Sequence, residues 1–224
     1  MTDGLVAAML SPPCAACGQI VSRSADGALC DACWRQLELE ANGERWPLAP
    51  PHIDLAASLG SYEGALRLAV HALKYEGRRS IASRLARLLG ERCGDLLEGA
   101  DAVVPVPLHP LRRWTRGFNQ SEEIAGALGA PPVWKTLRRT RRTPPQASLT
   151  ATAREANVHG AFAPRRAGRA ATRMPGSRVV LLDDVATTGA TLSACAVVLR
   201  RMGAAEVLAL TAARTLRSAD RHAA

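Results

Sequence analysis

The sequence predicts an α/β domain, with a mostly parallel sheet flanked by helices, behind a small cysteine-rich module. Two observations support this prediction. Over the last two thirds of the chain, short apolar runs typical of buried strands alternate with segments whose apolar residues recur every three or four positions. Near the start, four cysteines form two Cys-x-x-Cys pairs. A chain of 224 residues, 47% of them hydrophobic, has room for one such domain and one small module.

The cysteine-rich module comes first in the chain. Cys14 and Cys17 form one pair, and Cys30 and Cys33 form the other, with residues 18–29 between them. This spacing is typical of structural zinc sites, in which two tight turns present four thiolates to one tetrahedral ion. We therefore expect structural zinc, with an iron–sulfur centre or disulfides as the alternatives.

A proline-rich stretch at residues 46–51 separates this module from the rest of the chain. Its prolines disfavour regular structure, so we interpret it as a linker. The expected domains are therefore residues 1–50, the zinc module and linker, and residues 51–224, the α/β domain.

The first half of that domain is predicted to contain two amphipathic helices between two strands. Residues 55–60 suit a short edge strand. Residues 65–75 and 80–97 carry apolar side chains at helical spacing and are expected to be core-facing helices. The apolar run 102–104 ends at prolines, as a buried strand that leads into a loop does.

The second half repeats the alternation of helices and strands. The expected elements are helix 120–128, strand 133–137, strand 178–182, helix 189–202 and strand 206–211. Between them, residues 138–159 are rich in arginine, contain Pro144 and Pro145, and have no apolar period. We expect a long mobile loop there, of the kind that is often functional.

The chain is basic, with 29 Lys+Arg against 20 Asp+Glu and a formal charge of +9. Only Lys74 and Lys135 are lysines, so nearly all of the positive charge is arginine, which suits bidentate phosphate contacts. A GC-rich coding sequence would produce the same composition without any nucleic-acid partner. No apolar run is long enough to span a bilayer, and no basic segment precedes the apolar start of the chain. We expect a cytoplasmic protein.

The strongest candidate site follows the predicted strand 178–182. Two carboxylates come directly after this strand, where open α/β sheets place their ligand crevice, and small and hydroxyl residues follow as a helix begins. Carboxylates suit sugar hydroxyls or Mg²⁺, and the helix start suits a phosphate. The candidate ligand-binding residues are Asp183, Asp184, Ala186, Thr187, Thr188, Gly189, Ala190 and Thr191.

This segment has two other interpretations. Nucleotide hydrolases also place an aspartate after a buried strand, but they need a Gly-Lys-Ser/Thr loop, and neither lysine of this chain follows a glycine. Alternatively, Asp183 and Asp184 only cap a turn. Two adjacent carboxylates after an apolar run make a sugar phosphate site the more economical interpretation.

Residues 183–191 resemble the phosphoribosyl pyrophosphate signature of the type I phosphoribosyltransferases. The resemblance implies that Asp183 and Asp184 contact the ribose hydroxyls with the help of Mg²⁺, and that residues 187–191 surround the 5-phosphate. Ala186 departs from the pattern, since a larger aliphatic residue is common there. This departure removes no ligand group.

Further motifs resemble the ComF family across nearly the whole chain. They are Tyr62-Glu63-Gly64, Leu73-Lys74-Tyr75-x-Gly77, Pro105-Val106-Pro107-Leu108-His109-Pro110 and Arg116-Gly117-Phe118-Asn119-Gln120. The resemblance implies a phosphoribosyltransferase-like fold and a role in natural transformation, handling imported single-stranded DNA together with competence and recombination proteins. We expect a DNA-uptake protein that keeps a phosphoribosyl pyrophosphate site. The alternative is an active, Mg²⁺-dependent phosphoribosyltransferase with an unknown acceptor, for which no catalytic residue is assigned.

The segment after strand 102–104 supplies candidate contacts to pyrophosphate or DNA. These are Arg112, Arg113 and Arg116, with Trp114 available to stack on a base. Arginines at 138, 139, 141 and 142 are further candidates for DNA phosphates. The alternatives are a solvated basic face for the arginines, packing for Trp114, a core position for Phe118 and a helix N-cap for Asn119.

Overall fold

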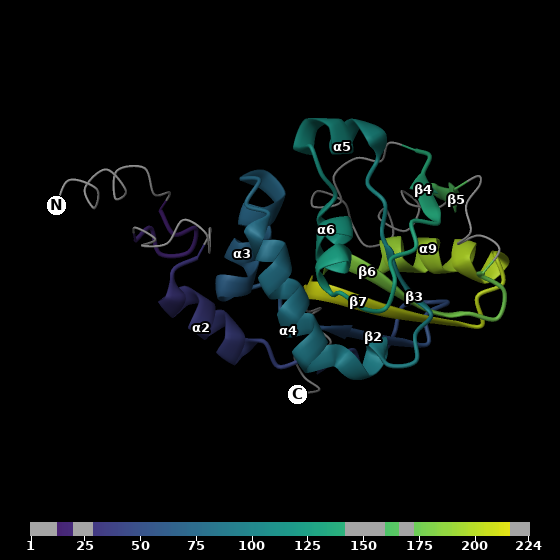
Figure 1. Ribbon diagram of the computed structural model, residues 1–224, viewed down its shortest axis with the longest axis horizontal. Coiled ribbons are helices and arrows are strands. Elements are labelled where there is room, and N and C mark those ends of the chain that lie inside the picture. Colours follow the sequence, from purple (N-terminus) through teal and green to yellow (C-terminus); the bar gives the residue numbers. More distant parts are fainter. Residues whose placement is uncertain (1–12, 20–28, 142–159, 166–172, 216–224) are drawn as a thin grey trace.

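The computed structural model describes residues 13–19, 29–141, 160–165 and 173–215, which form a sheet between two layers of helices (Figure 1). The sheet has five strands in the order β1-β2-β7-β6-β3. Their bounds are Glu44–Arg45 for β1, Leu55–Ser58 for β2, Ala102–Pro105 for β3, Arg178–Ala186 for β6 and Glu206–Arg214 for β7. All neighbouring pairs are parallel except β1 with β2. The expected mostly parallel sheet is confirmed.

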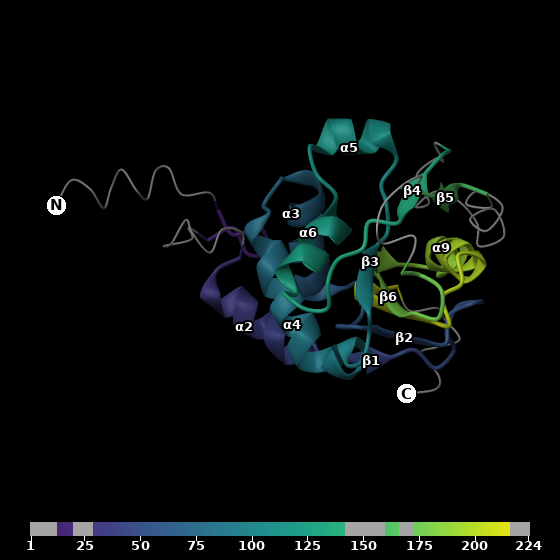
Figure 2. The ribbon, with the colours of Figure 1, turned by 45° about the vertical axis from the view of Figure 1, so that its right-hand side comes forward.

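Helices cover both faces of this sheet. Their bounds are Asp31–Glu40 for α2, Gly64–Tyr75 for α3, Ser80–Leu97 for α4, Pro110–Arg116 for α5, Gln120–Ala127 for α6 and Ala190–Arg201 for α9. Figures 1 and 2 show α3, α4 and α6 on one side of the sheet and α9 on the other. Side chains alternate along β6, so Val180 and Leu182 join the core under α3 and α4, while Val179 and Leu181 join the core under α9.

The described part of the N-terminal segment shares a core with the sheet and its helices. Trp34 and Leu37 on α2 are fully buried against α3 and α4, and Cys14 and Leu29 belong to the same hydrophobic cluster. The guanidinium group of Arg84 on α4 lies 4.8 Å from the centre of the Trp34 ring. The cysteine-rich segment is therefore packed onto the main body.

Several expected elements have different bounds in the structure. Strand β2 is not at the edge of the sheet, because β1 pairs with its outer side. The expected strand 133–137 is a single bridge at Val133 followed by β4 at Leu137–Arg139, which pairs with β5 at Phe162–Pro164. The expected loop 138–159 therefore begins as a strand, and its residues 142–159 lie outside the described part of the chain.

Two helices were not expected. Helix α2 begins inside the second cysteine pair, with Cys30 as its N-cap and Cys33 in its first turn. Helix α5 occupies part of the segment expected to be a loop; it begins at Pro110 after an N-cap at His109 and ends where Gly117 takes a left-handed conformation. No helix in the described ranges is long and apolar enough to cross a membrane.

Candidate functional site

The candidate loop lies at the carboxyl edge of the sheet, where β6 passes into α9. The sequence predicted that Asp183 and Asp184 follow the end of the strand. In the structure β6 continues to Ala186, so both aspartates lie within the last residues of the strand. Gly189 is the N-cap of α9, and a small hollow there is lined by residues of the loop, including Thr187 and Thr191. The first turn of a helix leaves N–H groups without intrahelical partners, which suits an anion such as phosphate.

Gly189 is required at its position for two reasons. Its φ of +77° is left-handed, and a Cβ atom added there would lie 2.4 Å from Cγ of Pro50. Trp46 lies against the same point. The proline-rich stretch therefore packs directly against the loop at Gly189. Its interpretation as a linker did not predict this contact.

Asp183 is held by two hydrogen bonds to one of its oxygens. Its Oδ1 accepts from Oγ of Ser121 at 3.0 Å and from the backbone N–H of Asp184 at 2.9 Å. Burial and the neighbouring charge of Asp184 raise the pKa of Asp183 to about 7, although the charge of Lys74 acts in the opposite direction. Ionisation of Asp183 is therefore opposed when no ligand is bound.

Lys74, in the last turn of α3, forms an ion pair with the second carboxylate. Its Nζ lies 2.9 Å from Oδ1 of Asp184, and the two side chains are 15% and 12% exposed. Burial acts to lower the pKa of Lys74, but the charge of Asp184 and the hydrogen bond to it outweigh burial and raise that pKa. The sequence analysis did not assign this residue to the site. The rarity of lysine in this arginine-rich chain was the available signal.

The corner between α5 and α6 brings Ser121 to the acidic pair. Asn119 caps α6 by accepting from the N–H of Ser121, and its Nδ2 donates to the carbonyl of Val106 at 3.0 Å. The N–H of Val106 in turn bonds to the carbonyl of Leu182 on β6. Phe118 is buried beside this corner. The N-cap and core interpretations of Asn119 and Phe118 are thus confirmed, and Ser121 is a further site residue that sequence reasoning missed.

Two of the candidate arginines of α5, Arg113 and Arg116, already have contacts within the protein. Arg113 forms an ion pair with Glu122 at 3.0 Å, and Lys135 reaches the same carboxylate at 2.8 Å. The guanidinium group of Arg116 lies 5.0 Å from the centre of the Tyr75 ring. The side chain of Arg112 lies outside the described part of the structure.

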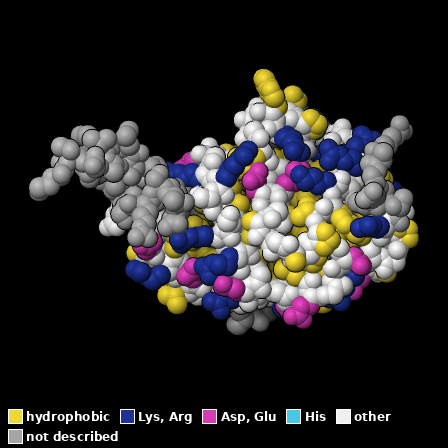
Figure 3. All heavy atoms as spheres, viewed as in Figure 1, with side chains coloured by type: hydrophobic (Ala, Val, Ile, Leu, Met, Phe, Trp, Pro, Cys, Tyr) yellow, Lys and Arg dark blue, Asp and Glu magenta, His cyan; other side chains and the backbone are white. Residues whose placement is uncertain are grey.

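Trp114 is 83% exposed on α5, so packing does not account for it. Helix α5 projects from the body of the molecule, and hydrophobic side chains stand out there beside Lys and Arg side chains (Figures 1 and 3). On β4, Arg138 donates to the carbonyl of Pro164 and Arg139 lies over the Phe162 ring. Arg142 falls outside the described residues.

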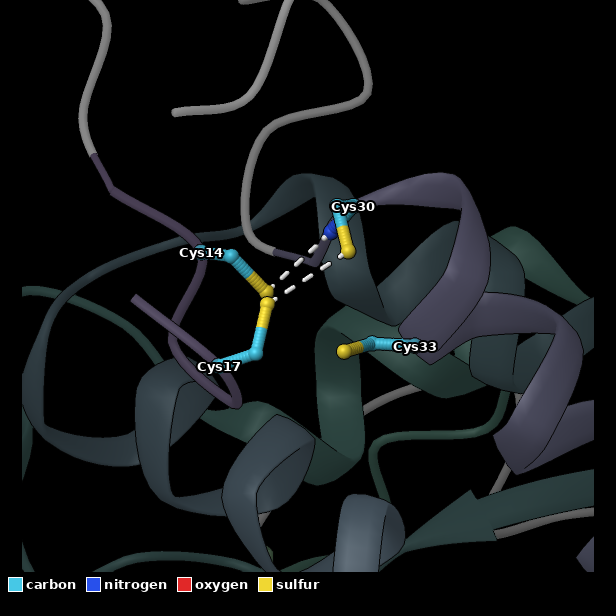
Figure 4. A group of neighbouring side chains, drawn as sticks. All are labelled: Cys14, Cys17, Cys30 and Cys33. Carbon is cyan, nitrogen blue, oxygen red and sulfur yellow. Dashed lines mark hydrogen bonds between the residues drawn. The ribbon is translucent and has the colours of Figure 1, made fainter. Parts of the chain in front are cut away.

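The four cysteines converge on one point, with their sulfurs directed toward a common centre (Figure 4). All four Sγ atoms of Cys14, Cys17, Cys30 and Cys33 lie within 4.8 Å of one another, near the separation of about 3.8 Å that tetrahedral Zn–S bonds of about 2.3 Å imply. Although burial opposes it, hydrogen bonds from the backbone of Cys17 and Cys30 lower the pKa of Cys14 to about 6. Burial and the neighbouring thiols raise the pKa of Cys33. Four such thiols ionise together only around a cation, so the group fits a metal ion.

The other two cysteines are fully buried free thiols, Cys93 on α4 and Cys195 on α9. Both take the expected place of a small hydrophobic residue.

A larger cleft of about 410 Å³ lies elsewhere, between α2 and the start of α3. Glu40, Glu44 and Glu63 contribute to its lining. Three carboxylates repel a phosphate, so the loop after β6 is the better candidate for an anionic ligand, although its hollow is smaller.

The chain is similar to curated proteins that are named for DNA utilization and for competence. It is 38% identical over 176 residues to the DNA utilization protein YhgH of Salmonella typhimurium, and 36% identical over the same length to that of Escherichia coli K12, with 75% of each chain covered in both cases. It is 32% identical over 166 residues to competence protein F of Haemophilus influenzae, covering 70% of this chain and 71% of the relative. No protein-family model matches the chain.

Solved structures similar to the chain include phosphoribosyl enzymes. An orotate phosphoribosyltransferase from Aeropyrum pernix is matched over 79% of this chain and 78% of its own, at 21% identity and a TM-score of 0.36. The glutamine phosphoribosylpyrophosphate amidotransferase of B. subtilis is matched over 58% of this chain and 25% of its own, at 23% identity and a TM-score of 0.37.

Proposed function

Because the chain belongs to the ComF family, we propose that it serves in the uptake or utilization of DNA and that it binds 5-phosphoribosyl pyrophosphate at residues 183–191. The relatives that show the family are named for DNA utilization and competence, which supports the first part. The proposed ligand is supported by the arrangement at the carboxyl end of β6, where Asp183 and Asp184 lie close to the start of α9. Carboxylates accept hydrogen bonds from ribose hydroxyls, and the helix start holds the 5-phosphate.

In this proposal Mg²⁺ accompanies the ligand. Mg²⁺ demands about six oxygen ligands, whereas one oxygen of Asp184 is already paired with Lys74. Diphosphate oxygens and water are therefore needed to complete its coordination. Mg²⁺ supplies charge neutralisation of the diphosphate, while the chain's own residues orient the ribose and the 5-phosphate.

Structural zinc is proposed for the four cysteines. A closed set of four thiolates leaves no position open for chemistry, so the ion stabilises the fold. The mutual distances of the sulfurs support this assignment. Metal analysis of the purified protein tests it: we expect one zinc per chain, and iron with sulfide would identify an iron–sulfur centre instead.

Calorimetry tests the proposed ligand. Titration of the purified protein with phosphoribosyl pyrophosphate and Mg²⁺ is expected to show one saturable site, and the Asp184→Asn variant is expected to bind at least about tenfold more weakly, because a hydrogen bond to a charged group is lost. Asp95→Asn is the matched control, since Asp95 is an exposed carboxylate on α4. Absence of binding to the unaltered protein would refute the ligand assignment.

The family role also requires a surface for DNA, and we assign it to α5. Trp114 offers an exposed ring for a base to stack on, next to the arginines of the same helix. Fluorescence anisotropy with a single-stranded oligodeoxynucleotide is expected to show binding that weakens with salt and with Trp114→Ala. Leu48→Ala, at a position that is 84% exposed, is the control and should bind normally. If Trp114→Ala binds the oligonucleotide as tightly as Leu48→Ala does, α5 is not part of the DNA-binding surface.

A further inference from the structure

Lys74 contacts the acidic pair directly. Its ammonium group approaches from the end of α3 and contacts Asp184, and its positive charge also acts on Asp183. Ser121 on α6 also faces the pair and donates to Asp183. Two adjacent, largely buried carboxylates thus share the positive charge of Lys74.

The residue type at position 74 is informative. Of 29 basic residues in the chain, 27 are arginine, and Lys74 and Lys135 are the two exceptions. Each of these lysines lies within 3 Å of a carboxylate, Lys74 at Asp184 and Lys135 at Glu122. An ammonium group is a compact point charge, whereas a guanidinium group is a wide planar fork. A compact cation beside two carboxylates occupies much the same position as a metal ion would.

Carboxylates that lie side by side and away from bulk water attract divalent cations, because each negative charge raises the cost of the other. A fixed ammonium group removes that attraction. We propose that Lys74 is the built-in counter-cation of Asp183 and Asp184 and determines the metal specificity of the site: it keeps free divalent cations away from the pair, so that Mg²⁺ enters only with a diphosphate ligand. The last clause rests on the proposed function, whereas the exclusion of free metal does not.

A purely structural role for Lys74 makes a different prediction. If the lysine only held α3 against β6, its removal would lower stability without creating affinity for a metal. The counter-cation role predicts that removing the charge creates a metal site in the absence of any phosphate ligand. Free metal binding therefore separates the two roles.

The experiment is a titration with Mn²⁺ alone, followed by electron paramagnetic resonance, on the zinc-loaded full chain. The variants are Lys74→Met, which removes the charge at similar length, and Lys74→Arg, which keeps the charge. Lys74→Met is expected to bind one Mn²⁺ about tenfold or more tightly than the unaltered protein, and Lys74→Arg is expected to behave like the unaltered protein. Adding Asp184→Asn to Lys74→Met should abolish the gain. Equal Mn²⁺ affinity of Lys74→Met and the unaltered protein would overturn the proposal.

A second measurement uses the unaltered protein, so it does not depend on whether a variant folds. With ¹⁵N-labelled lysine, the side-chain ammonium spectrum of this chain contains signals from Lys74 and Lys135 alone. Mg²⁺ alone is expected to leave the Lys74 signal in place, and a saturable shift by Mg²⁺ without phosphate would overturn the proposal. Because this result does not involve phosphoribosyl pyrophosphate, it stands even if calorimetry shows no binding of that ligand.

Discussion

The surroundings of Asp183 oppose the ionisation of its carboxyl group. The carboxyl group is largely buried next to the charge of Asp184, and its pKa rises to about 7, from an ordinary value of 3.8. The proposed ribose site gains from such an acceptor, but the folded protein without ligand is less stable because of it. Function and stability are therefore opposed at this residue.

Asp183→Asn is expected to stabilise the unliganded protein above pH 7. The folded state holds a proton on Asp183 that the unfolded state releases near pH 4, so ionisation of Asp183 lowers the free energy of unfolding progressively between about pH 4 and 7. Below pH 4 both states are protonated and the effect vanishes. We expect a gain of up to about 4 kcal/mol at pH 8 and almost none at pH 4 in chemical denaturation. An asparagine that destabilises the protein at pH 8 would show that the raised pKa is wrong.

Gly189→Ala is expected to damage both the fold and the site. The left-handed backbone and the contact with Pro50 leave no room for a Cβ atom, so we expect a loss of more than about 1 kcal/mol in the free energy of unfolding. Gly90→Ala is the matched control: Gly90 lies in the exposed middle of α4 with open space around it, and alanine there should stabilise by about 1 kcal/mol. Similar effects of the two substitutions would contradict the contact between the loop and the proline-rich stretch.

At the level of elements, amphipathic pattern was the reliable guide. The helices expected at residues 65–75 and 80–97 are α3 and α4, because each buries a complete apolar face. Helix α5 was missed because it is short, starts with a proline and leaves Trp114 in solvent, so it has no apolar face to detect. Strand β1 was missed because its two residues, Glu44 and Arg45, carry no strand signal.

The loop after β6 was predicted because its residues are contiguous in sequence and carry chemistry that the fold class places at a strand end. Lys74 and Ser121 were missed because they reach the site from α3 and α6, far away in sequence. Such contacts depend on how helices pack across the sheet, which periodicity does not describe. The support of Gly189 by Pro50 was missed for the same reason.

Removing the metal from the cysteine cluster is expected to destabilise the whole described body, not an isolated module. Trp34 and Leu37 on α2 belong to the same core as α3 and α4, so loosening the cysteine end of α2 exposes that core. Thermal unfolding in chelator should show one transition at a lower temperature than in zinc buffer, and Cys33→Ser should reproduce the shift. Two separate transitions, with the upper one unmoved, would contradict this packing.

At the scale of the whole molecule, the site joins elements from both layers of helices. Helices α3 and α6 lie on one face of the sheet and supply Lys74 and Ser121, while α9 starts on the other face and supplies the helix N-terminus proposed to bind the 5-phosphate. The sheet presents the carboxylates between them. A ligand that contacts all of these elements stabilises the entire fold.

A ligand that binds only the folded state stabilises the protein by mass action. At a concentration about 100 times its Kd, phosphoribosyl pyrophosphate with Mg²⁺ should add about 2.7 kcal/mol to the free energy of unfolding. Thermal unfolding of the unaltered protein and of Asp184→Asn at equal ligand concentration measures it, and the variant should gain less. A gain of the same size in both proteins would indicate binding elsewhere.

The decisive measurement is a crystal structure of the protein grown with phosphoribosyl pyrophosphate and Mg²⁺. We predict density for the ribose against the carboxylates of Asp183 and Asp184, and for the 5-phosphate at the start of α9, next to Thr188 and Gly189. A ligand bound elsewhere, or an empty loop at saturating concentration, would contradict the assignment of this loop to a phosphoribosyl group.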